Sequence, residues 1–125
     1  MQAYRASNDY MEQALRSPDP TAPELQDHFS GAALTESADL LLQAQQNLEY
    51  YESSLASDPE VVSGGSVEVV LRDCVTETLT IFDAASGAQK DARSTVGNWR
   101  VRVVDIDGVG WRVDEITLQE ESCTP

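Results

Sequence analysis

The first half of the chain shows apolar positions at helical spacing. Over residues 3–16 the apolar side chains fall on one face of a helix. Pro18 and Pro20 end this helix, because proline cannot continue a helical hydrogen-bond pattern. A short helix is predicted within 21–29, and a long one over 33–50, where leucines and alanines recur every three or four residues. The broad apolar stripe of the long helix indicates that it packs on a wide surface, such as a curved sheet.

The second half of the chain changes to a period of two residues. Residues 67–74 and 76–83 are rich in β-branched side chains, which are typical of strands. Residues 95–106 alternate between apolar and polar positions, as a strand with one buried face does. The Asp-Gly pair at 107–108 is a hairpin signal and leads to a closing strand at 111–118. This half is therefore predicted to be an antiparallel sheet.

The order of these elements predicts an α+β fold, with three N-terminal helices packed on a curved antiparallel sheet of four to five strands. We expect the helices within 3–50 and the strands within 58–119. The strands include a short first one around 61–62, and a C-terminal tail follows at 120–125. A chain of 125 residues has room for one hydrophobic core, so 1–125 is predicted to be a single domain.

The composition is that of a globular protein, with 41% hydrophobic and 24% charged residues. The net charge is −14, from 22 acids and 8 bases. Such a surface repels nucleic acids, whose binding depends on basic side chains, so no nucleic-acid partner is expected. No apolar stretch approaches the roughly 18 residues that a membrane span needs. The acidity either keeps the protein soluble or attracts a cationic partner.

Few residues could hold a metal or perform thiol chemistry. Cys74, Cys123 and the single histidine, His28, are too few for a structural zinc site. The aspartates around the hairpin turn lack the later ligands of a calcium loop. We therefore expect no metal and no cofactor. From the residues alone, the two cysteines form either one disulfide or two free thiols.

Four aromatic residues are candidates for lining a pocket. Tyr4 and Tyr10 lie on the first predicted helix, and Trp99 and Trp111 lie near the two ends of the closing hairpin. Core packing explains these side chains, but they could also form the aromatic wall of a site for a small apolar ligand.

Three segments in order resemble one family. Residues 3–34 combine an aromatic-rich helix, an Asp-Pro break and a short helix joined to a long one. Residues 58–77 contain a strand that ends in Asp-Cys, and residues 98–123 contain a hairpin with a tryptophan opening its last strand and a cysteine near the terminus. This arrangement resembles secreted lipoproteins of actinobacteria, whose function is generally unassigned. The closing hairpin is also similar to that of mammalian-cell-entry-associated proteins of mycobacteria.

The resemblance implies a nuclear-transport-factor-two-like fold, in which a long helix packs on a strongly bent sheet that encloses a cone-shaped pocket. Both cysteines match those of the family, so it also implies a disulfide between Cys74 and Cys123 and an oxidising compartment. We expect an extracellular or cell-envelope location. The signal segment and the lipid-bearing cysteine of the family are not in this chain.

These observations lead to three functional hypotheses. The first is a non-catalytic binding or assembly module, whose partner is another protein or a second copy. The second is a carrier that holds a small apolar ligand in the cone. The third is an isomerase-like enzyme, which needs a buried carboxylate (Asp73, Asp83 or Glu115) beside Tyr4 or Tyr10. Because the positions of these residues do not reproduce the isomerase arrangement, we expect no catalytic residues.

Overall fold

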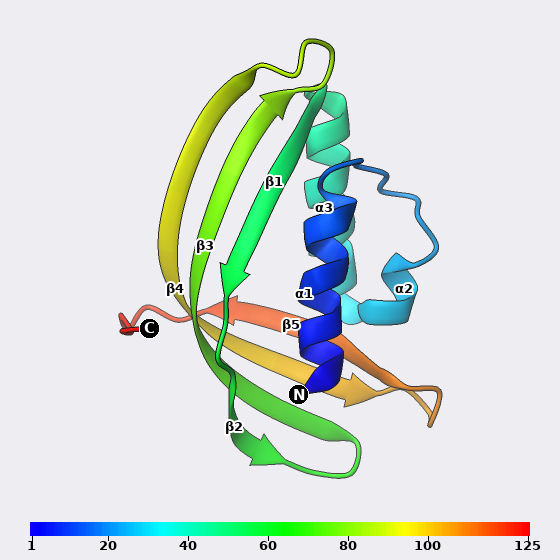
Figure 1. Cartoon of the computed structure of the whole chain (residues 1–125). Helices are drawn as coiled ribbons and strands as arrows, with labels where there is room; N and C mark the ends of the chain where they lie inside the picture. The colour runs from blue at the N-terminus through cyan, green and yellow to red at the C-terminus, as the bar shows by residue number, and fades with distance from the viewer.

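Two long, bent strands organise the protein (Figure 1). In the computed structural model, which covers residues 1–125, β3 (Glu68–Asp83) and β4 (Gln89–Asp105) pair antiparallel along almost their whole length. Each pairs with further strands at its edges: β1 (Glu49–Ala56) and β2 (Glu60–Gly64) lie along β3, and β5 (Trp111–Leu118) lies along β4. The result is one antiparallel sheet of five strands, in the order β1-β3-β4-β5 with β2 also beside β3.

Three helices cover the concave face of this sheet. They are α1 (Gln2–Ala14), α2 (Leu25–His28) and α3 (Gly31–Gln46). Figure 1 shows α1 and α3 on the inner side of the bend, with α2 at the outer end of the loop between them. None of the helices is both long enough and apolar enough to cross a bilayer.

Alternation along β3 separates the two faces of the sheet. Leu71, Asp73 and Val75 are almost completely buried and point toward the helices. Arg72 and Cys74, which lie between them, point to the outer face because successive side chains alternate. The core between the helices and the inner face is built from thirteen buried side chains: Tyr4, Leu15, Leu25, Phe29, Ala33, Leu41, Ala44, Tyr51, Leu71, Ile81, Val101, Val103 and Val113.

The α+β class, the three helices on the sheet and its antiparallel five-stranded character are confirmed. The predicted end of the long helix was wrong. The helix predicted over 33–50 ends at Gln46, Leu48 adopts a positive φ of 54°, and β1 begins at Glu49. This strand therefore lies outside the predicted strand region of 58–119. Pairing with β3 determines its structure, because its own apolar alternation is weak and only Tyr51 is buried.

The sheet also has longer strands than the sequence pattern predicted. The two segments predicted at 67–74 and 76–83 form one continuous strand, β3. β4 begins at Gln89 and not at residue 95, because the turn after β3 is short and the exposed start of β4 carries no apolar alternation. The hairpin around 107–108 and the closing strand at 111–118 agree with the prediction.

Candidate functional site

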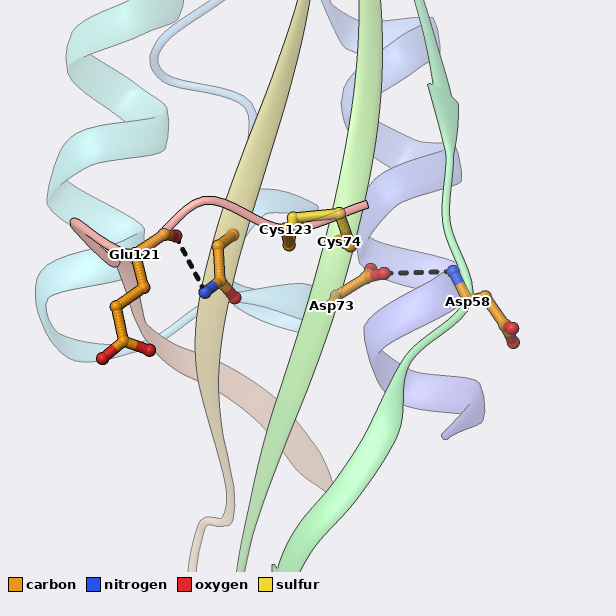
Figure 2. Close-up of a disulfide and its surroundings, with 6 residues drawn as sticks. Asp58, Asp73, Cys74, Glu121 and Cys123 are labelled. Carbon is orange, nitrogen blue, oxygen red and sulfur yellow. Dashed lines mark hydrogen bonds between the residues drawn. A yellow bond between two sulfur atoms is a disulfide. The ribbon is translucent and has the colours of Figure 1, made fainter. Parts of the chain in front are cut away.

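A buried carboxylate joins three distant parts of the chain. Asp73 is 1% exposed, and its Oδ2 accepts hydrogen bonds from the Tyr4 hydroxyl at 2.6 Å and the Ser57 hydroxyl at 2.5 Å. Its Oδ1 accepts from the backbone N–H of Asp58 at 3.0 Å (Figure 2). Burial, followed by the hydrogen bond to Asp73, raises the pKa of Tyr4 well above its ordinary value. The carboxylate thus connects α1, β3 and the link between β1 and β2.

This pair is the arrangement that the isomerase-like hypothesis requires, a buried carboxylate beside a tyrosine. Both oxygens of Asp73 are already occupied by donors from the protein. Asp73 also does not line the surface hollow described below. The contacts of Asp73 are those of a group that fixes the packing of neighbouring segments.

The other two candidate carboxylates lie elsewhere. Asp83 holds the turn between β3 and β4, where its Oδ1 accepts from the backbone N–H groups of Ala85 and Ser86, each at 2.9 Å. These hydrogen bonds lower the pKa of Asp83, and the one from the Ser86 N–H has the largest effect. Glu115 is exposed and accepts from the hydroxyl of Thr117 at 3.0 Å. Neither Asp83 nor Glu115 is hydrogen-bonded to a tyrosine.

The four candidate aromatic residues take part in packing at separate places. Tyr4 is fully buried, and Tyr10 stacks on His28 with ring centroids 4.7 Å apart. Trp99 and Trp111 are half-buried and contact the core. Trp99 lies so close to Gly97 that a Cβ there would be 2.6 Å from the indole nitrogen. The hollow described below is lined by other residues.

The predicted disulfide is confirmed, and it fixes the C-terminal tail to the outer face. Cys74 and Cys123 are bridged, with their Cα atoms 5.9 Å apart. Figure 2 shows the tail crossing β4 to reach Cys74 on β3. Two hydrogen bonds hold the tail along its path, from the Gln119 N–H to the Asn98 carbonyl at 2.8 Å and from Asn98 Nδ2 to the Glu121 carbonyl at 3.1 Å. The tail is therefore a fixed part of the outer surface.

The space beside the tail forms a hollow of about 500 Å³. Arg72 and Arg100 line it from the strands, and Glu120 and Glu121 line it from the tail. Its other lining residues are Val62, Asn98 and Gln119. The lining is therefore charged and polar, unlike the apolar cone that a carrier of apolar ligands would need.

An open strand edge of the sheet lies along the start of β4. β5 pairs with β4 only from Trp99 onward, so Gln89–Gly97 has β3 on one side and no strand on the other. The corresponding edge of β1 is covered by α1, because the Tyr51 N–H donates to the Leu15 carbonyl and the Leu55 N–H donates to the Glu12 carboxylate. The start of β4 is thus a long strand segment with an uncovered edge.

Alternation identifies the backbone groups on this open edge. The Asn98 carbonyl points to the β5 side, since it accepts from Gln119. Backbone groups alternate between the two sides of a strand, so those of Val96, Ser94 and Ala92 point the same way. The Ala92 N–H is taken up by the Asp91 side chain at 2.9 Å. Ser94 and Val96 are left with free N–H and C=O groups in the middle of the edge.

Sequence reasoning missed this edge because it began the strand at residue 95. The available signal was the polar run over 89–95 directly before an alternating strand, with its charged residues and no large apolar side chain. Such a composition is typical of exposed edge strands.

Glu77 is the acidic residue on the inner face beside this edge, where it pairs with Leu55 and Thr95. Burial raises its pKa above the ordinary 4.5, and the positive charge of Arg93 opposes this only partly. Because the pKa of Glu77 is raised in the folded state, folding favours its neutral carboxyl form. The contribution of Glu77 to the free energy of unfolding is fully present below pH 4.5 and is lost as the pH rises through the folded-state pKa.

Glu77→Gln is therefore expected to raise the free energy of unfolding at neutral pH by up to about 1 kcal/mol. The gain should disappear as the pH is lowered below 4.5, where the Glu77 side chain of the wild type is neutral, as the glutamine of the variant is. Urea unfolding at several pH values measures it, with Glu52→Gln as the control, because Glu52 lies exposed on the same sheet. A gain that does not change with pH would contradict the role of burial.

Comparisons with known proteins place the fold. No family model matches the chain, and no curated protein matches its sequence. Among solved structures, the intermembrane space region of the chloroplast protein ARC6 is similar with a TM-score of 0.69 and 19% identity, over 94% of this chain and 96% of that one. The Kfla4162 protein from Kribbella flavida is similar with a TM-score of 0.58 and 13% identity, over 94% and 90%. At these identities the likeness shows a shared fold alone.

Proposed function

We propose that this chain is a non-catalytic protein-binding module that accepts an extended segment of a partner protein as an additional strand along β4. The open edge over Gln89–Gly97 is the observation that supports this function. A strand added there would extend the sheet without moving any element. The free N–H and C=O groups of Ser94 and Val96 would supply its central main-chain hydrogen bonds.

Charge favours a basic partner over a second copy of the chain. The protein carries a net charge of −14, so two copies repel each other. The basic residues near the edge are already neutralised: Lys90 pairs with Glu49 at 2.7 Å, and Arg93 pairs with Asp91 at 3.0 Å. A segment with alternating basic residues would gain attraction from the acidic surface while its backbone pairs with β4.

The family and location follow as part of the same proposal. The order of sequence motifs and the long helix on a bent sheet support a nuclear-transport-factor-two-like domain of the actinobacterial lipoprotein kind. The Cys74–Cys123 bridge supports an oxidising compartment, and we place the protein outside the cell membrane on that basis. A binding module in the cell envelope needs no catalytic residues, in agreement with the fully occupied oxygens of Asp73.

The test uses an alternating valine–lysine peptide and the Ser94→Pro variant. Proline at position 94 removes the outward N–H but no hydrogen bond to β3, so the fold should be retained. We expect the peptide to shift backbone amide resonances of residues 92–96, to bind more weakly as salt is added, and to lose at least ~10-fold in affinity in Ser94→Pro. The matched control, Ser94→Ala, keeps the N–H and should bind as the wild type does.

Equal affinity of Ser94→Pro and Ser94→Ala, or resonance shifts confined to another surface, would contradict strand addition at this edge. A concentration-dependent dimer that Ser94→Pro abolishes would show that a second copy, and not a basic partner, occupies the edge. Native mass spectrometry of the wild type and of both variants distinguishes these outcomes.

A further inference from the structure

We infer that the hollow beside the C-terminal tail binds a small zwitterionic molecule. The two arginines on the strands would hold its anionic group, and the two glutamates on the tail would hold its ammonium group. The site lies on the outer face of β3 and β4, and this inference does not depend on the proposed strand addition.

Two adjacent arginines that form no ion pair define the wall that would hold the anionic group of the ligand. Arg72 and Arg100 are direct cross-strand neighbours on β3 and β4, and both are exposed. Neither has a carboxylate within 4.0 Å, although the protein has 22 acidic residues, and Glu60 lies opposite Arg72 on β2. Like charges directly opposite each other destabilise a sheet. Two adjacent guanidinium groups form a matching site for one oxyanion, which would relieve this repulsion.

Two glutamates of the C-terminal tail define the wall that would hold the ammonium group of the ligand. Glu120 and Glu121 line the same hollow and form no ion pair of their own. The backbone of the tail is fixed by the disulfide and by the two hydrogen bonds with Asn98. The Glu121 side chain extends from the tail away from the disulfide (Figure 2). The two carboxylates are thus carried on a wall of fixed position and are not on a free chain end.

The sum of the charges selects the class of ligand. The lining contains two arginines and two glutamates, and its remaining residues are neutral, so its net charge is zero. A simple anion would be attracted by the strands and repelled by the tail, and a simple cation would experience the reverse. A molecule with both charges is attracted by both walls. A volume of about 500 Å³ is sufficient for a ligand the size of a dipeptide.

A buried acceptor supports a ligand with N–H donors. Asn98 lines the hollow and is only 8% exposed. Its Nδ2 donates to Glu121, whereas its Oδ1 is buried and has no hydrogen-bond partner. Buried polar atoms without a partner are rare. This oxygen is not exposed to the hollow, so a ligand would reach it only after the Asn98 side chain turns, and the ammonium group of a zwitterion then supplies the donor that it lacks.

The experiment titrates the ¹⁵N-labelled, oxidised protein with glycylglycine, N-acetyl-glycylglycine and glycylglycine amide. We expect glycylglycine to give saturable amide shifts at Arg72, Asn98, Arg100 and the tail, with a Kd on the order of 1 mM. The two blocked peptides, each with a single charge, should bind at least ~10-fold more weakly.

Two sets of variants test the two ends separately. Binding of glycylglycine should be abolished in the double variant Arg72→Gln, Arg100→Gln. It should weaken at least ~10-fold in the double variant Glu120→Gln, Glu121→Gln. Arg93→Gln is the matched control, because it removes an arginine of β4 that already pairs with Asp91. Circular dichroism confirms that each variant is folded.

Three results would overturn the inference. The first is the absence of saturable shifts with glycylglycine in the folded wild type. The second is equal binding of the N-acetyl peptide, which would show a plain anion site. The third is unchanged binding in the glutamine variants of the arginines. A peptide that binds along β4 produces shifts at residues 92–96, so failure of this inference and failure of the proposed strand addition are distinguishable.

Discussion

Asp73→Ala is expected to lower the free energy of unfolding by about 2–4 kcal/mol, because it leaves the buried Tyr4 hydroxyl and two partly buried donors without their acceptor. Those donors are the Tyr4 and Ser57 hydroxyls and the Asp58 N–H, all of which bind the Asp73 carboxylate. They belong to α1 and to the link between β1 and β2, so their loss loosens both attachments to β3. Urea unfolding followed by circular dichroism measures the change.

Two matched variants separate the hydrogen bonds from the volume of the side chain. Asp73→Asn keeps the shape and one acceptor but places an amide N–H₂ group among donors, so a smaller loss of about 1–3 kcal/mol is expected. Asp91→Ala removes an exposed carboxylate that pairs only with Arg93 and with the Ala92 N–H, and it should change stability by less than about 1 kcal/mol. If Asp73→Ala were as mild as Asp91→Ala, the buried network would not hold α1 in place.

The Asp73 network also illustrates how far the sequence could predict the site. Aspartate before Cys74 gave a candidate carboxylate, and Tyr4 was a candidate partner, but their contact spans 69 positions of the chain. Strand alternation places Asp73 and Cys74 on opposite faces only after the strand itself is known. The burial of Asp73 and its partners depend on α1 and Ser57, which no local pattern connects to it.

The fold class could be predicted because its signals are local. Helical spacing, β-branched runs and the Asp-Gly turn each act within a few residues, and together they gave the order of helices and strands. β1 could not be predicted in this way, because Glu49–Ala56 continues a helix-forming segment and becomes a strand only by pairing with β3. Tertiary pairing outweighs the weak preference of such a segment.

The open edge and the charged hollow depend on contacts between segments that are far apart in the sequence, so no local pattern predicts them. The edge exists because β5 pairs with β4 only as far as Trp99, and strand registers are not visible in one sequence. The hollow exists because Arg72, Arg100 and the tail meet on one outer face. The sequence identified Cys123 through a resemblance, and it is the bridge from this residue that brings Glu120 and Glu121 beside the two strands.

Removal of the disulfide is expected to lower the free energy of unfolding by about 4 kcal/mol, because the bridge closes a loop of 49 positions in the unfolded chain. This value follows from loop-closure entropy, which the bridge removes from the unfolded state. The test compares urea unfolding of the oxidised protein with that of the double variant Cys74→Ala, Cys123→Ala. The double variant avoids a free thiol that could react between molecules.

The same variant tests what positions the tail. Without the bridge, only the hydrogen bonds of Gln119 and Glu121 with Asn98 tie the tail to the sheet. We expect the backbone of residues 120–124 to become mobile, with lower ¹⁵N order parameters, while the amides of β3 and β4 keep their order of protection from hydrogen exchange. A chain shortened to end at Gln119, with Cys74→Ala, is the control and should match the double variant in stability. A loss below about 1 kcal/mol in the double variant would contradict the loop-closure argument. A tail that stays rigid in this variant would assign the fixing of the tail to Asn98.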